Sequence, residues 1–397
     1  MDLRIETTSD GVIAHSPTTA AALSWRWLRD HGDDEASRDP VTGQRRVDTF
    51  SIDAAAAGAV AVTDHSLQVT WPDGSRTEID LAGLARTCAE AHPPLRQARA
   101  SLAMALPPGA APWPQGNGDR HGDDAPAPDP VDRTAFLTDD AARAAGVEHL
   151  ARHGYVVLRL APDEVSPTPV DHGLATAIAE RIGYVRQTIF GGIWDLAPDL
   201  TEHADTSYSS VELLPHTDGT YSHDAPGLQF LVCNTAAERG GQSILVDGFA
   251  IATDMAHDEP DLAATLAAVA VPGQYLEPGV HLRAERPPFR IDHTGILRQV
   301  SFNNYDRAPF VLAPDDEARF YAAYSALAAQ VMDRTRWRTI TLHDGDAVVF
   351  DNWRMLHGRT SFEGHRHYVG GYLNHEDFES TRRVLASNVT SSGATHS

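Results

Sequence analysis

The sequence predicts a mainly β protein with flanking helices, arranged as a sandwich or jelly roll behind a small β-rich N-terminal domain. Three observations support this fold class. Alternating apolar and polar residues, the pattern of half-buried strands, recur within residues 1–100. Short apolar segments of strand composition follow between residues 228 and 372, and few stretches have helical spacing. A chain of 397 residues is long enough for two or more domains.

The first domain is expected over residues 1–100. Its strand signals are the alternating segments 46–52 and 66–71. The Pro-Asp-Gly turn at 72–74 separates the second segment from a short third one at 77–79. We therefore predict a small β-rich N-terminal domain.

A linker is predicted over residues 101–133, which are rich in Pro, Gly and Asp. A segment of this composition buries too little apolar surface to fold by itself, and its prolines favour an extended spacer. The main domain is expected over residues 134–386. The Ser/Thr-rich tail, residues 387–397, is predicted to be disordered.

The main domain is expected to begin with a helix at 139–153, a buried strand at 154–160 and a second helix at 175–182. Further helices are predicted from apolar spacing at 249–257, 261–269 and 315–335. The strands are expected at 228–232, 243–246, 297–302, 347–350 and 367–372.

Charge and composition exclude several classes of protein. The chain has 32 basic and 55 acidic residues and a formal net charge of −23, which argues against nucleic acid or anionic membrane as a partner. Two cysteines, Cys88 and Cys233, are too few for a disulfide scaffold or a cysteine-based zinc site. The sequence shows no signal peptide and no apolar run of membrane-spanning length. We expect a soluble, cytoplasmic protein.

His216 and Asp218 are the first candidates for a chemical site. If both lie on one strand, their spacing of two places the imidazole and the carboxylate on the same face. His357 follows the apolar strand 348–350, whose end would place it at the mouth of a barrel. Two imidazoles and one carboxylate are the ligands of non-haem iron(II) oxygenases, although a zinc hydrolase can use the same set.

Arg366 helps to distinguish these two chemistries. An oxoacid co-substrate needs a guanidinium for its far carboxylate, and Arg366 lies nine residues beyond His357 on the next predicted strand. Ser243, which follows Gly-Gly-Gln at 240–242, is a plausible hydroxyl partner for the same carboxylate. This pair favours an oxygenase that uses 2-oxoglutarate.

Several motifs together resemble the γ-butyrobetaine and trimethyllysine dioxygenase family, within the taurine dioxygenase-like superfamily, and they do so along nearly the whole chain. They are His216-Thr217-Asp218, Gly240-Gly241-Gln242-Ser243, Val246-Asp247-Gly248-Phe249, the segment 351–359 that reads DNWRMLHGR, Trp27-Leu28-Arg29-Asp30 and Trp71-Pro72-Asp73-Gly74. The resemblance implies a double-stranded β-helix (jelly roll) catalytic domain, Fe(II), 2-oxoglutarate and dioxygen, and hydroxylation of an unactivated C–H bond. Residues 192–195, 205–208, 303–307 and 370–373 look more like the trimethyllysine enzyme.

The resemblance also implies an aromatic cage for a quaternary ammonium group, at Phe190, Trp194, Tyr208 and Tyr372. Such a cation donates no hydrogen bond, so it is held by the faces of rings, at about 0.5–2 kcal/mol for each contact. The family more often has tyrosine at the position of Phe190.

The other end of the substrate is expected to meet polar residues. In a trimethyllysine-like site Asp205 pairs with the α-ammonium group, which γ-butyrobetaine lacks. The substrate carboxylate then falls to Asn303, Asn304 or Arg307.

The N-terminal part departs from the family, which usually binds structural zinc there through cysteines and a histidine. The corresponding positions here are Gly32, Asp34, Ser37 and Ser75, so no structural zinc is expected. We expect this module to be held by its own core or by a partner subunit in a homodimer.

The leading functional prediction is 3-hydroxylation of N6-trimethyllysine. The nearest alternative is hydroxylation of γ-butyrobetaine or of another quaternary-ammonium compound, such as a phosphonate analogue. A zinc-dependent hydrolase and a non-enzymatic binding protein for quaternary ammonium compounds are the remaining alternatives.

Overall fold

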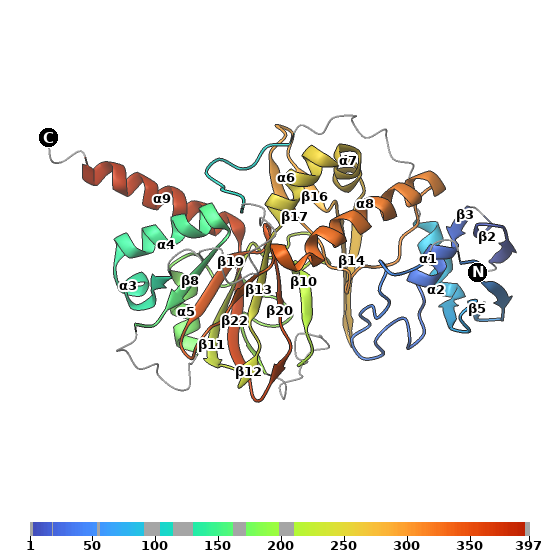
Figure 1. Ribbon diagram of the computed structural model, residues 1–397, viewed down its shortest axis with the longest axis horizontal. Coiled ribbons are helices and arrows are strands. Elements are labelled where there is room, and N and C mark those ends of the chain that lie inside the picture. Colours follow the sequence, from blue (N-terminus) through green and yellow to red (C-terminus); the bar gives the residue numbers. More distant parts are fainter. Residues whose placement is uncertain are drawn as a thin grey trace.

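A computed structural model describes residues 3–17, 19–53, 56–90, 104–113, 130–161, 172–197 and 210–393, with side chains described as far as residue 387 in the last range. The N-terminal part lies at one end of the molecule and the C-terminal helix at the other, with the large sheets between them (Figure 1). None of the helices in the described ranges is both long and apolar enough to cross a membrane.

The N-terminal part contains two small antiparallel sheets and two helices. One sheet is β1 (Arg4–Thr7), β2 (Gly11–His15) and β3 (Ala20–Ser24), and the other is β4 (Ala59–Val62), β5 (Ser66–Thr70) and β6 (Arg76–Asp80). The helices are α1 (Trp25–Asp30) and α2 (Leu81–Ala89). Three tryptophans, Trp25, Trp27 and Trp71, are buried in a shared core that also includes Val311. The strands predicted at 66–71 and 77–79 are confirmed.

The strand predicted at 46–52 is wrong. The segment consists of turns, bends and irregular backbone, and its polar side chains bond to nearby backbone and to α1. The Asp48 carboxylate accepts the Phe50 amide at 3.0 Å, and the Thr49 hydroxyl donates to Asp30 at 2.5 Å. These bonds satisfy polar groups that a ladder would otherwise pair.

Two sheets form the jelly roll, as predicted. The larger has the order β7-β8-β19-β11-β22-β9 and the smaller β10-β20-β13-β18. Their strands are β7 (Val131–Asp132), β8 (Tyr155–Arg159), β19 (Ala347–Asp351), β11 (Leu228–Thr235), β22 (His367–Leu373), β9 (Ile193–Leu196), β10 (Leu213–His216), β20 (Met355–Arg359), β13 (Ser243–Asp247) and β18 (Arg338–Ile340). Tyr155 and Phe350 of the larger sheet pack against Leu245 and Met355 of the smaller one, so a buried layer joins them.

Helices cover the sheets on both sides (Figure 1). The buried residues of α4 (Asp140–His153), α5 (His172–Glu180) and α3 (Arg133–Thr138) pack in one core with the large sheet. A second core joins α6 (Gly248–Asp258), α7 (Pro260–Ala268) and α8 (Pro314–Met332) to β16 (Phe289–Ile291) and β17 (Leu297–Val300). The remaining paired strands are β14 (Val271–Glu277), β15 (Val280–Arg286), β12 (Arg239–Gly240) and β21 (Phe362–Glu363). The predicted helices are confirmed to within a few residues.

Two predicted segments differ from the structure. Helix α9 (His375–Gly393) covers residues 387–393, where we expected a disordered tail. Its first turn carries Glu376 and Asp377, which suit the positive helix N-terminus. In the predicted linker, the described residues 104–113 contact the jelly-roll part of the chain: Arg354 donates to the Ala111 carbonyl at 2.8 Å.

Candidate active site

Strand pairing brings the two candidate histidines together. His216 ends β10, and His357 lies directly opposite it on the antiparallel strand β20. Their ring centroids are 4.6 Å apart. Residues directly opposite each other in an antiparallel pair present their side chains on the same face, so the ladder itself juxtaposes two imidazoles that are distant in sequence.

Asp218 reaches the same place by a different route from the one expected. Strand β10 ends at His216, so the alternation of a strand does not position the carboxylate. Instead, the Asn352 side chain clamps the turn: it accepts the Asp218 amide at 2.8 Å and donates to the Asp218 carbonyl at 3.1 Å. Gly219, with a φ of +70°, then turns the chain away, a conformation that favours glycine.

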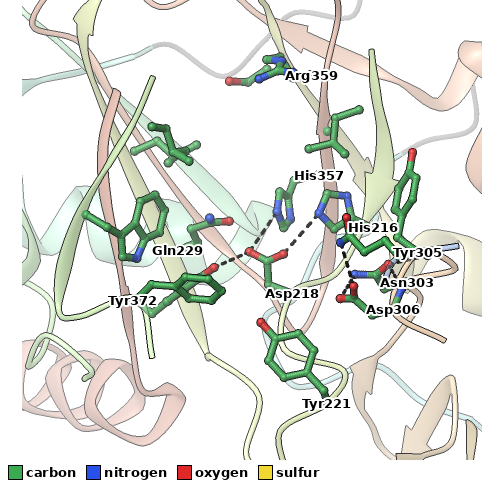
Figure 2. Close-up of a pocket in the computed structure, with 18 of the residues that line it drawn as sticks. His216, Asp218, Tyr221, Gln229, Asn303, Tyr305, Asp306, His357, Arg359 and Tyr372 are labelled. Carbon is green, nitrogen blue, oxygen red and sulfur yellow. Dashed lines mark hydrogen bonds and ion pairs between the residues drawn. The ribbon is translucent and has the colours of Figure 1, made fainter. Parts of the chain in front are cut away.

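The three side chains fit a divalent metal ion. Candidate ligand atoms of His216, Asp218 and His357 all lie within 4.8 Å of one another, and no other group of this kind was found in the described residues. Nε2 of His216 is 3.3 Å and Nε2 of His357 is 3.5 Å from the Asp218 carboxylate (Figure 2). Nδ1 of His216 donates to the Leu214 carbonyl at 2.9 Å, which leaves Nε2 as the free lone pair for a metal.

The three groups are shifted in different directions: burial lowers the pKa of His216, but Asp218 outweighs burial and raises that pKa. Burial opposes the ionisation of Asp218, but the two imidazoles outweigh it and hold its pKa well below the usual range. Burial lowers the pKa of His357, more than Asp218 raises it. One ligand is therefore an anion, and His357 is neutral near pH 7, as metal coordination requires.

A cationic region forms a second part of the cavity. Arg366, just before β22, is buried and stacks on Tyr368 at 3.7 Å, and its Nε has no hydrogen-bond partner. Burial lowers the pKa of Arg366, and burial together with Arg366 lowers that of Arg359 to about 10. Both arginines and Ser243 line the cavity. Two guanidiniums and a hydroxyl suit the carboxylate of an oxoacid. The sequence alone did not single out Arg359, although its position two residues after His357 on one strand places both on one face.

Aromatic side chains form a third part. Phe190, Trp194 and Tyr372 all line the cavity, and the rings of Trp194 and Tyr372 are 5.4 Å apart. The Tyr372 hydroxyl donates to Asp218 at 2.8 Å, so the aromatic wall directly contacts the metal-ligand set (Figure 2). Tyr221 also lines the cavity and was missed in the sequence, where no spacing connects it to the others.

The predicted polar contacts divide into two groups. Asn303 lines the cavity, together with Tyr305. Asn304 and Arg307 do not: the Asn304 side chain donates to Thr49 at 3.2 Å and accepts from Arg307 at 3.0 Å, away from the cavity. Consecutive side chains point in different directions, and these two are directed into the contact with the N-terminal part.

Five more residues were singled out in the sequence. Asp205 and Tyr208 lie outside the described residues. Three of the four positions that correspond to the family's zinc ligands make hydrogen bonds within their loops: the Asp34 carboxylate accepts the Ser37 amide and hydroxyl, each at 3.0 Å, and the Ser75 hydroxyl donates to Asp73 at 2.5 Å.

The whole cavity encloses about 930 Å³ of space, part of it open to solvent. Besides the residues described above, its lining includes Gln44, Leu196, Leu213, Gln229, Leu231, Asp306 and Gly358.

The candidate ligand triad and the buried guanidiniums fit one class of protein, a dioxygenase that uses Fe(II) and 2-oxoglutarate. Comparison with known sequences identifies the family within this class. Residues 122–372 match the model of the family described as "Taurine catabolism dioxygenase TauD, TfdA family", and the chain belongs to this family. Family membership and the residues of the cavity together argue against a zinc-dependent hydrolase and against a non-enzymatic binding protein.

Individual relatives are similar along most of the chain. Trimethyllysine dioxygenase, mitochondrial, of Gallus gallus is 31% identical over 92% of this chain and 84% of its own length. The Homo sapiens protein of the same name is 29% identical over 92% and 83%. Gamma-butyrobetaine dioxygenase of Pseudomonas sp. is 30% identical over 55% of this chain and 57% of its own. The solved structure of an asparagine oxygenase has a TM-score of 0.48, at 18% identity over 61% of this chain and 82% of that one.

Proposed function

We propose that the enzyme hydroxylates a trimethylammonium compound, and that its substrate is N6-trimethyllysine, oxidised at carbon 3. The aromatic wall carries this proposal: Phe190, Trp194 and Tyr372 line the cavity beside the metal-ligand set. Ring faces attract a cation that cannot donate hydrogen bonds. The relatives named trimethyllysine dioxygenase, similar over about nine-tenths of the chain, support the same substrate.

Each part of the cavity has a role in this proposal. His216, Asp218 and His357 would hold Fe(II), which with 2-oxoglutarate and dioxygen supplies the chemistry that converts C–H to C–OH, with succinate and carbon dioxide as co-products. Arg366 and Ser243 bind the far carboxylate of 2-oxoglutarate, and Arg359 adds positive charge to the same region.

The aromatic wall has two roles. It binds the trimethylammonium group, and the Tyr372 hydroxyl fixes the orientation of the Asp218 carboxylate through the 2.8 Å hydrogen bond. We also assign Asp205 and Tyr208, outside the described residues, to the substrate: Tyr208 to the cage and Asp205 to the α-ammonium.

The test is succinate formation by the iron-loaded enzyme across a substrate panel. N6-trimethyllysine should stimulate turnover of 2-oxoglutarate far more than lysine does, because lysine presents a strongly hydrated ammonium to the rings. A Trp194→Leu variant should lose this preference, since it removes one ring face. Equal turnover of lysine and trimethyllysine by the wild-type enzyme contradicts the proposal.

γ-Butyrobetaine, or a phosphonate analogue of it, is the second candidate. The Pseudomonas relative favours it, and Asn303 offers an amide to its carboxylate. Comparing trimethyllysine with simple betaines distinguishes the two, because only the amino acid carries an α-ammonium.

We also propose the organisation of the protein. Residues 1–100 form a small domain, which the core of Trp25, Trp27 and Trp71 supports, residues 101–133 connect it, and residues 134–386 form the catalytic domain. We propose a homodimer in the cytoplasm. Light scattering of the purified protein tests the dimer: a mass near 42.9 kDa, that of one chain, contradicts it.

A further inference from the structure

One residue of the N-terminal part lies in the wall of the active-site cavity. Gln44 belongs to the loop between α1 and β4, more than 250 positions before the segment that it contacts. Its side chain donates to Oδ1 of Asp306 at 3.0 Å, and the next amide, that of Arg45, donates to the Tyr305 carbonyl at 3.0 Å. The loop is therefore tied to the 303–306 segment by both side-chain and backbone bonds.

Asp306 is a buried carboxylate in this wall. Only 8% of its surface is exposed, and it lines the cavity. Oδ1 accepts from Gln44, and Oδ2 accepts from the Asn303 amide at 2.8 Å. Each carboxylate oxygen has two lone pairs, so a single hydrogen bond does not exhaust what a carboxylate oxygen can accept. The two amides fix the direction in which the carboxylate points.

The carboxylate and the aromatic wall lie on different sides of the metal ligands. Figure 2 shows Tyr372 on one side of Asp218, and Asn303, Tyr305 and Asp306 on the other, beside His216. The rings of Tyr305 and His216 are 6.1 Å apart and perpendicular, which places this polar wall next to the metal site. A substrate bound across the site has one end at the rings and the other at Asp306.

We propose that Asp306, held by Gln44 and Asn303, determines substrate specificity by binding the ammonium group at the end of the substrate away from the aromatic wall. The proposal rests on the proposed function, and adds a second carboxylate to the role assigned to Asp205. A molecule with a cation at each end matches a cavity that has rings on one side and a carboxylate on the other.

The same carboxylate acts against the competing substrate. γ-Butyrobetaine carries a carboxylate where trimethyllysine carries its α-ammonium and carboxylate together. Two buried carboxylates close to each other repel, so Asp306 disfavours a simple betaine. The Asn303 amide and the Tyr305 hydroxyl, which accepts the Leu214 amide at 3.3 Å and keeps its own hydrogen for donation, are available to the α-carboxylate of the amino acid.

The test is the isosteric variant Asp306→Asn, assayed with both substrates. For trimethyllysine, kcat/KM and the calorimetric affinity of the anaerobic enzyme should fall about 10- to 100-fold, the effect of losing a charge-assisted bond. For γ-butyrobetaine kcat/KM should stay constant or rise, because a repulsion is removed. The KM for 2-oxoglutarate should not change, since Asp306 lies away from Arg366.

Gln44→Leu provides a second variant, which leaves the carboxylate but removes its donor. It should move selectivity in the same direction by a smaller factor, about 3- to 10-fold. Gln68→Leu on β5, also in the N-terminal part and outside the cavity, is the matched control and should behave as the wild-type enzyme.

The outcomes separate the two proposals. Unchanged selectivity in Asp306→Asn, or an equal loss for both substrates together with a raised KM for 2-oxoglutarate, overturns the role of Asp306 and leaves the proposed function intact. If the wild-type enzyme accepts γ-butyrobetaine and not trimethyllysine, the proposed function is wrong. In that case the role of Asp306 still requires that Asp306→Asn improve γ-butyrobetaine turnover, and a decrease overturns it.

Discussion

One cluster of buried charge lies where the N-terminal part meets the rest of the chain, and another lies in the cavity. In the first, Asp30 accepts from Arg45 at 2.9 Å, from Arg307 at 2.5 Å and from Tyr321 at 2.8 Å. In the second, Arg366 makes no ion pair with any carboxylate in the described part of the chain, and faces a cavity instead.

This difference separates a structural charge from a ligand-binding one. Burial raises the pKa of Asp30, but Arg307 and then Arg45 outweigh it and hold that pKa well below the usual range, so the ion pair is formed within the protein. Burial lowers the pKa of Arg366 more than Tyr368 and Cys233 raise it, and no carboxylate is among the groups that raise it. A buried cation of this kind costs free energy unless an anion arrives. The two clusters should therefore respond in opposite ways to mutation.

The largest expected effect is on the metal site. His216→Ala should reduce succinate formation by at least about 100-fold, because even residues that only support metal ligands cost 10- to 100-fold when removed. Iron content should fall in parallel, and the unfolding midpoint of the metal-free protein should change little. His293→Ala, an exposed histidine, is the control. Full activity in His216→Ala contradicts the ligand assignment.

The next effect is on stability. Asp30→Asn should lower the free energy of unfolding by about 3–5 kcal/mol, because it leaves two buried guanidiniums without their anion. Chemical denaturation measures it. Asp73→Asn removes the partner of Arg29 in an ion pair whose aspartate is half exposed, and it should change stability only slightly. Equal effects of the two substitutions would mean that burial does not distinguish these pairs.

Arg366→Gln is expected to weaken binding of 2-oxoglutarate without lowering the stability of the protein. The KM for 2-oxoglutarate should rise about 10- to 100-fold through loss of a charge-assisted bond. The stability of the ligand-free protein should stay constant or increase, because a buried charge without a protein anion is removed. Arg298→Gln, at an exposed pair with Asp292, serves as control. If Arg366→Gln destabilises the ligand-free protein as much as Asp30→Asn does, Arg366 stabilises the fold and is not kept for a ligand.

The sequence predicted those features of the fold and of the cavity that depend on local patterns. The candidate ligands His216 and His357 and the cavity residue Arg366 lie in or beside contiguous motifs at strand ends, and the jelly roll was predicted from its short apolar strands. Asp218 was placed correctly near His216 for the wrong reason, since the Asn352 side chain, not strand alternation, positions it.

The remaining parts depend on contacts between distant segments. Gln44 meets Asp306 from 262 positions away, and no local pattern relates them. Within residues 303–307 the sequence offered several polar side chains and no means of deciding which face the cavity. Asn303 does, whereas Asn304 and Arg307 bond to Thr49 and Asp30.

The smallest expected effect is on the pH dependence of stability, and it concerns the carboxyl group of Glu317 near Asp30. Burial is the main reason that the pKa of Glu317 is raised to about 7 from its ordinary 4.5, and the charge of Asp30 adds to it. Between these two pH values the folded protein keeps a proton that the unfolded chain releases, so stability falls as pH rises from about 4.5 to 7.

Glu317→Gln removes this titration. The variant should be more stable than the wild-type protein by about 1–3 kcal/mol at pH 8, and the difference should vanish towards pH 4.5. Denaturation curves across this pH range measure it, with Glu363→Gln on the surface as control. If the difference in stability between Glu317→Gln and the wild-type protein does not depend on pH, Glu317 affects stability through packing and not through its charge.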